Sequence, residues 1–420
     1  MVATRISKKS KAGGPLKPMI MEIIIALCLG LIAGTITGLI PGIHINLIAA
    51  LILSLITTLS GLPTIAIATF IASMAITHTF LDFIPSIFFG APEEDTFLSI
   101  LPGHQYLKEG KAYEAVILTL YGSLMALATI VIFAPVFIFI IPVIFSYVKL
   151  IFPFILIFLS LYLIFREKNF LLSLTIFIFS GFLGIASFNL PIQNPLLPLL
   201  SGLFGASALI ITIKQKTSIP KQTIYPIKQI KTTKQEFLKA ISGAIISAPI
   251  CSFLPGIGAG HAAVIGSEFI QQSKRGFLIL LGAINTIVMG LSFITIFSIG
   301  RTRTGAALAI KSVLETVTLQ DISILIVTIV VSGIVSFLIA LNISKIFSKY
   351  ISKIDYSYLS ISILIVLSVI ILAFSNALGF LTFITASALG VFTILSGARR
   401  INLMGVLLIP TITFYLLSSI

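Results

Sequence analysis

The chain has 420 residues, of which 58% are apolar and only 10% are charged, and its formal net charge is +14. This composition excludes an ordinary water-soluble enzyme, because soluble domains are about 25% charged. At about 20 residues per crossing, it predicts an all-α polytopic protein of the cell membrane with about 9–12 transmembrane or re-entrant helices. The lipid bilayer is therefore its first expected partner.

Basic residues gather in two segments that flank the predicted membrane regions. Residues 1–19 hold five cations and no acid, and residues 214–239 hold seven cations and one acid. Because Lys and Arg are enriched in cytoplasmic loops, we predict a cytoplasmic tail and a cytoplasmic loop here. Neither segment shows the basic and aromatic pattern of a nucleic-acid surface, so no nucleic-acid partner is expected.

The apolar segments fall into two predicted membrane repeats, residues 20–213 and 240–420. Pro135 and Pro142 interrupt the longest segment, which is either one broken helix or two. In chain order the predicted spans are 20–40, 63–81, 115–148, 150–165, 170–190 and 196–213 in the first repeat, and 240–254, 277–299, 322–343, 358–374, 377–395 and 403–417 in the second.

The repeat prediction comes from shifting the chain on itself by 214 positions. Between residues 22 and 50, eight of 29 positions then match without a gap, including Glu22 with Glu236 and the Pro-Gly-Ile of residues 41–43 with that of residues 255–257. Both halves share one order: a charged helix start, an apolar helix, a Pro-Gly break and a short apolar helix. Matched breaks of this kind are typical of secondary transporters, whose site lies between the repeats.

The two breaks provide the predicted substrate-binding site. A helix that begins within the membrane presents unpaired backbone N–H groups, which bind anions with help from the helix dipole. The alternative is that both Pro-Gly pairs are surface turns. The residues assigned to substrate binding around the breaks are Pro41, Gly42, His44, Asn46, Pro255, Gly256, Gly258, Gly260 and His261.

Ionisable residues inside apolar segments are candidates for ion coupling, because they are costly in a membrane unless they have a function. Asp82 follows His78 by one helical turn, so the two side chains can share a face. We assign both to the coupling of Na⁺ or H⁺. The alternatives are a neutral hydrogen-bonded histidine and an aspartate that only marks the membrane edge.

The second half offers further polar groups near an apolar span. Asn285 and Thr286 are neutral hydrogen-bonding residues, and Arg301 and Arg303 lie between small residues where they can bind a carboxylate. We assign all four to substrate binding. The alternative for the arginines is anchoring at the membrane rim.

Common catalytic motifs are missing from the sequence. It has no H-E-x-x-H, no G-x-S-x-G and no G-x-x-x-x-G-K-[ST]. Cys28 and Cys251 lie in apolar segments without a Cys/His cluster. We therefore expect no enzyme activity, no catalytic residue, no cofactor and no metal site.

Three segments also carry a family resemblance: Pro41-Gly42, Leu254-Pro255-Gly256-Ile257-Gly258, and residues 102–115 with their Gly110-Lys111-Ala112 turn. They are similar to the large membrane subunit of tripartite tricarboxylate transporters, in a divergent, archaeal-type branch. The resemblance implies uptake of a small di- or tricarboxylate, with a small membrane subunit and a soluble binding protein as partners.

The sequence thus predicts a secondary-active permease for small organic anions, driven by an ion gradient. An ion or anion channel is the first alternative, since broken helices also line pores. An intramembrane enzyme or lipid-handling protein is the second, with His78, Asp82 and the acidic residues 93–95 as its candidate groups.

Overall fold

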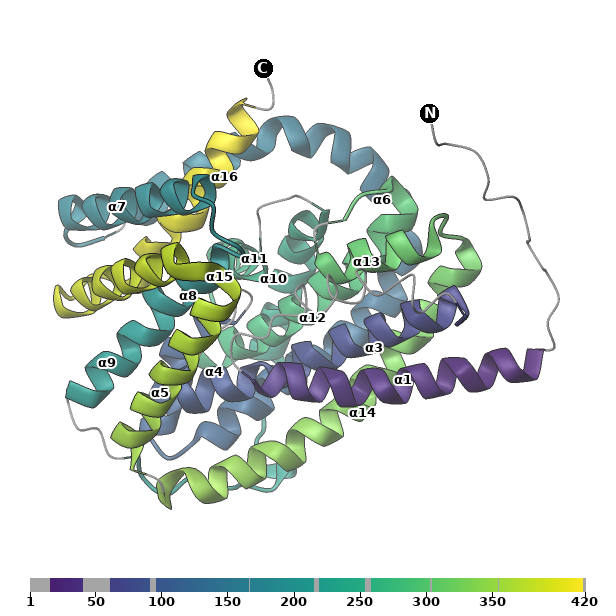
Figure 1. Cartoon of the computed structure of the whole chain (residues 1–420), viewed down its shortest axis with the longest axis horizontal. Helices are drawn as coiled ribbons and strands as arrows, with labels where there is room; N and C mark the ends of the chain where they lie inside the picture. The colour runs from purple at the N-terminus through teal and green to yellow at the C-terminus, as the bar shows by residue number, and fades with distance from the viewer. Residues whose placement is uncertain are drawn as a thin grey trace.

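The chain folds as a bundle of helices without a soluble domain among the residues that the structure describes (Figure 1). The computed structural model describes residues 16–40, 61–90, 96–165, 167–214, 219–253, 258–302, 304–353 and 355–417. Nine helices within these residues are long and apolar enough to cross a membrane. The all-α polytopic fold predicted from composition is confirmed.

The helices of the first half begin with α1 and end with α9. Short 3-10 turns and one π-helical segment, η2 (Ser201–Ala206), connect several of them. Their bounds are α1 Leu16–Leu39, α3 Thr64–Leu81, α4 Phe83–Phe89, α5 Ile100–Lys108, α6 Ala112–Phe165, α7 Phe170–Asn189, α8 Leu196–Leu200 and α9 Ser207–Lys214.

The second half runs from α10 to α16, with the 3-10 segment η5 (Arg400–Met404) before the last helix. The bounds are α10 Lys234–Phe253, α11 Ala259–Phe269, α12 Lys274–Ile299, α13 Gly305–Leu314, α14 Leu319–Tyr350, α15 Tyr356–Leu395 and α16 Gly405–Leu417.

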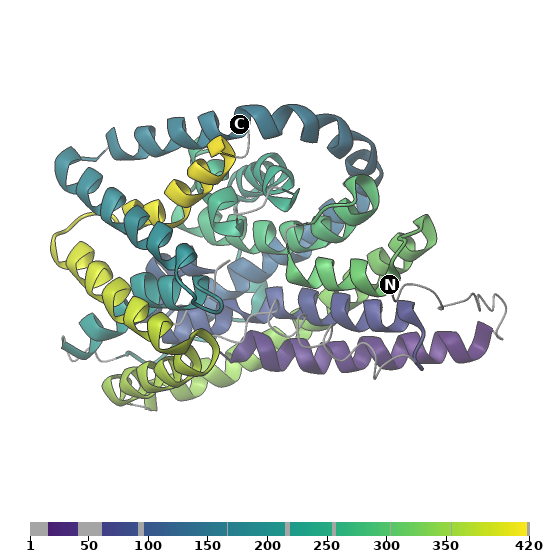
Figure 2. The same cartoon turned by 45° about the horizontal axis from the view of Figure 1, so that its top comes forward.

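One predicted boundary between helices is absent from the structure, and another is confirmed. The spans 115–148 and 150–165 form one helix, α6, which continues through Pro135, Pro142 and Pro153. At about 1.5 Å per residue its 54 residues extend about 80 Å, and Figure 2 shows it curving over the top of the molecule. The break predicted between 358–374 and 377–395 is confirmed, because Asn376 inside α15 has φ 61° and ψ −174°.

Helix α1 packs against α3 through glycines at intervals of four residues. A Cβ atom on Gly30 or Gly34 would lie 2.6 Å from the carbonyl oxygen of Phe70 or 2.4 Å from that of Met74. Small residues at this spacing let membrane helices approach closely. Positions 30, 34 and 38 of α1 meet 70–73, 74–77 and 78–81 of α3 in ascending order, so the two helices are parallel.

Corresponding contacts show that α6, α10 and α12 also run in one direction. Gly122 and Ile130 of α6 lie beside Ile279 and Gly290 of α12, in ascending order. In α10, residues 236 and 243 lie beside 276 and 280 of α12. On the other side, Ser73 and Phe88 meet Ser332 and Phe347 of α14, so α14 is parallel to α3 and α4.

The two sets of helices, α1, α3 and α14 in one and α6, α10 and α12 in the other, run in opposite directions. At their junction Thr79 contacts Thr286 while Asp82, further along α3, contacts Asn285. Figure 1 shows the same opposition of α3 and α12. Helices α1 and α10 therefore begin at opposite ends of the bundle.

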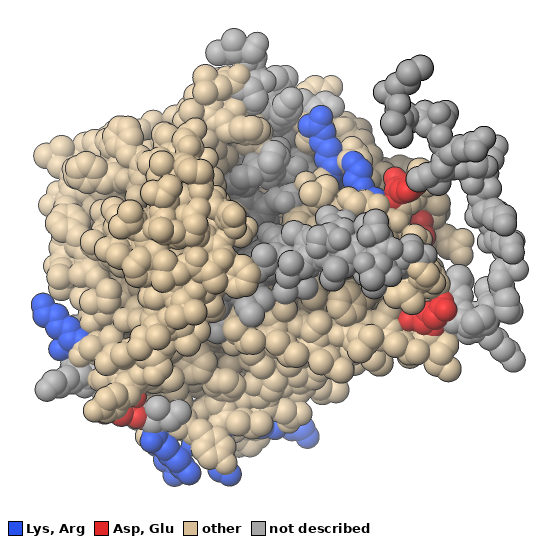
Figure 3. Space-filling model, viewed as in Figure 1, with Lys and Arg blue, Asp and Glu red and all other residues tan. Residues whose placement is uncertain are grey.

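Charged side chains avoid the middle of the surface. In Figure 3 the visible Lys, Arg, Asp and Glu lie toward the two ends of the molecule, and a broad uncharged band lies between them. Many large apolar side chains are exposed, including Phe139, Phe158 and Phe182. Exposed apolar surface of this kind is stable in contact with lipid tails.

Candidate functional site

The two antiparallel sets of helices meet at a buried carboxylate. Asp82 ends α3 and begins α4, and Asn285 lies near the middle of α12. The Nδ2 group of Asn285 donates a hydrogen bond to Oδ2 of Asp82 at 2.8 Å. Both side chains are only 2% exposed. One carboxylate is thus held by a neutral amide from the other set of helices.

Hydroxyl and imidazole groups extend this polar centre. The Thr79 and Thr286 hydroxyl oxygens are 3.3 Å apart, and Nδ1 of His78 lies 3.1 Å from Oγ1 of Thr37. All four side chains are buried. His78 and Asp82, which the sequence placed on one face, therefore contact residues of two different helices, α1 and α12.

The centre lies deep within the membrane-spanning part of the bundle. Asn285 and Thr286 occupy the middle of the 26 residues of α12, whose apolar character is continuous. A carboxylate at this depth costs several kcal/mol in hydrocarbon unless protein groups or a bound cation stabilise it. Its oxygen atoms can bind a hard cation or a proton. The arrangement can bind and release one positive charge.

The second Pro-Gly break itself, residues 254–257, lies outside the described residues, which end at Phe253 before it and resume at Gly258. Helix α11 starts after Gly258, and Nδ1 of the buried His261 accepts a hydrogen bond from the Gly258 backbone N–H at 3.1 Å. Gly266 of α11 packs against Gly243 of α10. The rise of 1.5 Å per residue then puts Gly258 about 12 Å further along α10, within the depth spanned by α12.

The remaining predicted site residues lie elsewhere or outside the described residues. Arg301 follows the end of α12, is exposed, and has its guanidinium 5.4 Å from the ring centre of Phe145. Sixteen residues of chain separate it from Asn285, or about 24 Å of helix, so the two do not share one binding position. Outside the described residues lie Pro41, Gly42, His44, Asn46, Pro255, Gly256 and Arg303.

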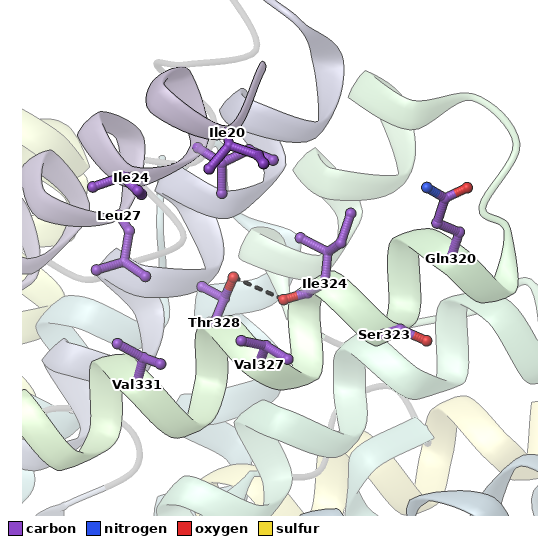
Figure 4. A pocket seen from close by; sticks show the side chains of 10 residues that line it. Ile20, Ile24, Leu27, Gln320, Ser323, Ile324, Val327, Thr328 and Val331 are labelled. Carbon is purple, nitrogen blue, oxygen red and sulfur yellow. Dashed lines mark hydrogen bonds between the residues drawn. The ribbon is translucent and has the colours of Figure 1, made fainter. Parts of the chain in front are cut away.

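An apolar groove of about 570 Å³ lies between α1 and α14 (Figure 4). Ile20, Ile24 and Leu27 line one wall, and the α14 wall includes Val327. The Thr328 hydroxyl donates to the Ile324 carbonyl at 2.9 Å, so it is not directed to a ligand. A carboxylate would lose its hydration here without compensation, and the groove is unsuited to the predicted substrate.

Sequence reasoning missed the threonines that complete the polar centre. Thr37 and Thr79 lie within apolar stretches, where Thr commonly donates to its own helix, and Thr79 Oγ1 also donates to the Ile76 carbonyl at 2.8 Å. The only signal was indirect: Thr79 lies between the two ionisable residues that were identified. Their partners depend on how helices from the two halves cross.

A helical membrane bundle with a buried carboxylate at the junction of its two halves is typical of membrane transport proteins. A family model agrees with it: residues 24–405 match the tripartite tricarboxylate transporter TctA family, and the chain belongs to that family. The family is one of transporters that work with partner subunits in tripartite systems.

A curated archaeal relative supports the divergent branch suggested by the sequence. The uncharacterized protein MJ1079 of Methanocaldococcus jannaschii is 31% identical over 362 residues, covering 83% of this chain and 88% of the relative. No solved structure matches the chain. The family resemblance and the multi-pass membrane location are thus confirmed.

Proposed function

We propose that the chain is a secondary-active permease for small organic anions, of the di- or tricarboxylate type, driven by a Na⁺ or H⁺ gradient. Membership of the TctA family supports the transport role and the substrate class. The observation that carries ion coupling is the Asp82 carboxylate, buried between the two antiparallel sets of helices and bonded to Asn285.

In this proposal Asp82 accepts the coupling ion and Asn285 positions the carboxylate. The 2.8 Å contact to Asp82 changes the role proposed for Asn285 from substrate binding to ion coupling. His78 keeps a coupling role, because its imidazole lies one turn from Asp82 and contacts Thr37 of α1. Ion binding at Asp82 then alters contacts that join both sets of helices, which links the ion to a movement of one set against the other.

The substrate anion is proposed to bind at the Pro-Gly breaks. On the described side, the positive end of the α11 helix dipole lies within the membrane, and Gly258 and Gly260 let an anion approach the backbone closely. His261 supports that start by accepting from the Gly258 N–H. The first break, with His44 and Asn46, and Arg303 remain predictions from the sequence.

We also infer that residues 20–213 and 240–420 are inverted repeats. Helices α1 and α10 end at Leu39 and Phe253, which differ by the 214 positions of the sequence repeat. Each packs in parallel against the long helix that follows its break, α3 or α12. Because the two pairs run in opposite directions, the repeats have opposite orientations in the membrane.

We infer that the end holding residues 219–239 faces the cytoplasm. With inverted repeats, Lys345, Lys349 and Lys353 at the end of α14 lie at the same end as the start of α10. Lys111, at the start of α6, joins them. This end then carries the larger group of Lys and Arg residues, as the positive-inside rule requires.

Reconstituted liposomes test the proposal. Purified protein is given an inward Na⁺ or proton gradient separately, and accumulation of labelled di- and tricarboxylates is followed. We expect uphill accumulation with one gradient and its loss in Asp82→Asn. Glu315→Gln is the control, because Glu315 is an exposed carboxylate at the end of α13. Passive equilibration would favour a channel instead.

A second arm addresses partners, since family members work in tripartite systems. Coexpression with a small membrane subunit and addition of a soluble binding protein should raise the uptake rate if such partners serve this chain. Absence of flux in every combination would contradict the permease assignment.

A further inference from the structure

A second polar region lies away from the Asp82 centre. It is an open cleft of about 1080 Å³ between α5, α9, the α11–α12 connection and the segment before η5. Among the described residues, four cationic side chains line it, Lys108, Lys274, Arg399 and Arg400, against one acid, Glu268. Glu268 is seven residues from His261 along α11, or about 10 Å. The cleft is therefore separate from the proposed substrate site.

Arg400 is the most constrained of the four cations. Its Nη2 group donates to the carbonyls of Phe204 and Leu203, the latter at 3.2 Å, and to the Ser207 hydroxyl at 3.2 Å. The guanidinium lies 5.3 Å from the ring centre of Phe204, while Nε is buried without a hydrogen-bond partner. No carboxylate of the described residues pairs with it. A largely buried charge without a counterion is unfavourable.

The other cations divide into one that is paired and two that are available. Arg399 forms an ion pair with Glu167. Lys108 and Lys274 extend from the end of α5 and the start of α12, and neither forms an ion pair with a described acid. With Arg399 neutralised, Lys108, Lys274 and Arg400 against Glu268 leave two positive charges in the described part of the lining.

His104 adds a neutral hydrogen-bonding group to the lining. Burial, together with the positive charges of Arg400 and Lys108, lowers its pKa to about 3. The imidazole therefore stays uncharged at neutral pH and can donate or accept.

We propose that this cleft is a second binding site, for a compact anion that carries two negative charges, such as a phosphate or a small dicarboxylate. The charge balance and the unpaired Nε of Arg400 support this ligand. Apolar walls, including Phe277 and Ile401, fit the hydrocarbon part of a dicarboxylate or of a lipid that carries a phosphate headgroup. A soluble anion and an anionic lipid are two sources of the same chemistry.

Binding measurements on the full chain test this site. Calorimetry in uncharged detergent uses inorganic phosphate and succinate as probes, on the wild type and on Lys108→Gln with Lys274→Gln. We expect at least 10-fold weaker binding in the double variant, because it removes two charge-assisted contacts to the anion. Lys345→Gln with Lys353→Gln removes the same charge from α14 and the turn after it, and should leave binding unchanged.

A second experiment, with lipid, distinguishes a lipid headgroup from a soluble anion as the ligand. Thermal unfolding is compared in nanodiscs with and without an anionic phospholipid. Stabilisation of the wild type that is lost only in the Lys108 and Lys274 variant assigns the site to a lipid headgroup. If neither probe nor lipid binds, or if both variants lose binding equally, the proposal is wrong. Because Asp82 is intact in both variants, uptake driven by an ion gradient can persist while this proposal fails.

Discussion

Asp82 and Arg400 are both charged groups within an apolar bundle, but their surroundings differ. Asp82 is 2% exposed and bonds to a side chain from the opposite set of helices. Arg400 lies at an open cleft and bonds mainly to backbone carbonyls of a neighbouring segment. A change of charge at Asp82 must therefore alter the contact between the two sets, whereas binding near Arg400 can be local. The comparison suggests coupling at the first and docking at the second.

The largest effect should come from removing the amide that holds Asp82. Asn285→Leu leaves the carboxylate buried without this donor, at a cost of about 1.5–3 kcal/mol. We expect a 10- to 100-fold lower rate of gradient-driven uptake in liposomes. The matched control is Asn342→Leu, because Asn342 is exposed and donates only to the Leu338 carbonyl of its own helix. Equal losses in both variants would contradict a special role for Asn285.

Exchanging the two side chains should have a smaller effect. The double variant Asp82→Asn with Asn285→Asp keeps one carboxylate and one amide at the junction. If the pair itself binds the coupling ion, uptake should recover by at least 5-fold over Asp82→Asn alone. The measurement is the initial uptake rate. Recovery would show that the pair binds the ion whichever of the two positions holds the carboxylate. No recovery would restrict the coupling role to Asp82.

The next effect concerns the turn at Gly110, which contacts residues 221–223 of the basic loop. Gly110 has φ +74°, and a Cβ there would lie 3.0 Å from the Lys221 carbonyl oxygen. The Gly110 carbonyl accepts from the Thr223 N–H at 2.8 Å. We expect the positive φ alone to make Gly110→Ala lower the free energy of unfolding by about 1–2 kcal/mol. The close approach of the new Cβ to the Lys221 carbonyl should lower it further. Thermal unfolding in detergent measures the change.

Gly300→Ala provides the control for this variant. Gly300 also has a positive φ, +63°, but no atom lies within 4 Å of its Cβ position. It should show the backbone cost without the steric one. Equal destabilisation by both variants would mean that the loop contact contributes nothing.

The smallest predicted effect is a dependence of stability on pH at the cleft. The pKa of His104 falls from 6.5 to about 3 on folding, mainly because the imidazole is buried. The unfolded chain then binds a proton that the folded chain does not, so stability declines as pH falls below 6.5. We expect His104→Gln to reduce the loss in unfolding temperature between pH 7 and pH 5. An unchanged loss would assign the acid sensitivity to other groups.

The sequence predicted local structure better than it predicted which helices contact one another. The break in α15 was predictable because Asn376 caps the second part of that helix: its Oδ1 accepts from the N–H groups of Leu378 and Gly379. The continuity of α6 was not, since prolines usually break helices, whereas helices that span a membrane tolerate them.

For the candidate site, the sequence identified Asp82 and Asn285 separately. It could not join them, because 203 positions separate the two residues and only the antiparallel crossing of α3 with α12 brings them together. The cleft was missed for a similar reason: its cations come from α5, α12 and the segment before α16, and each alone is an ordinary basic residue at a helix end. Segment-by-segment reading gives candidates, and the crossing of helices decides which of them cooperate.

The packing of first-half helices against second-half helices has a consequence for synthesis of the chain. Helix α6 packs against α12, and α3 against α14, so two helices of the first half depend on partners that are translated later. At about 5–20 residues per second, the 203 residues between Asp82 and Asn285 take roughly 10–40 seconds to emerge. Throughout that interval the Asp82 carboxyl group lacks its amide donor. Protonation of the carboxyl group lowers the cost of keeping it in the membrane until Asn285 arrives.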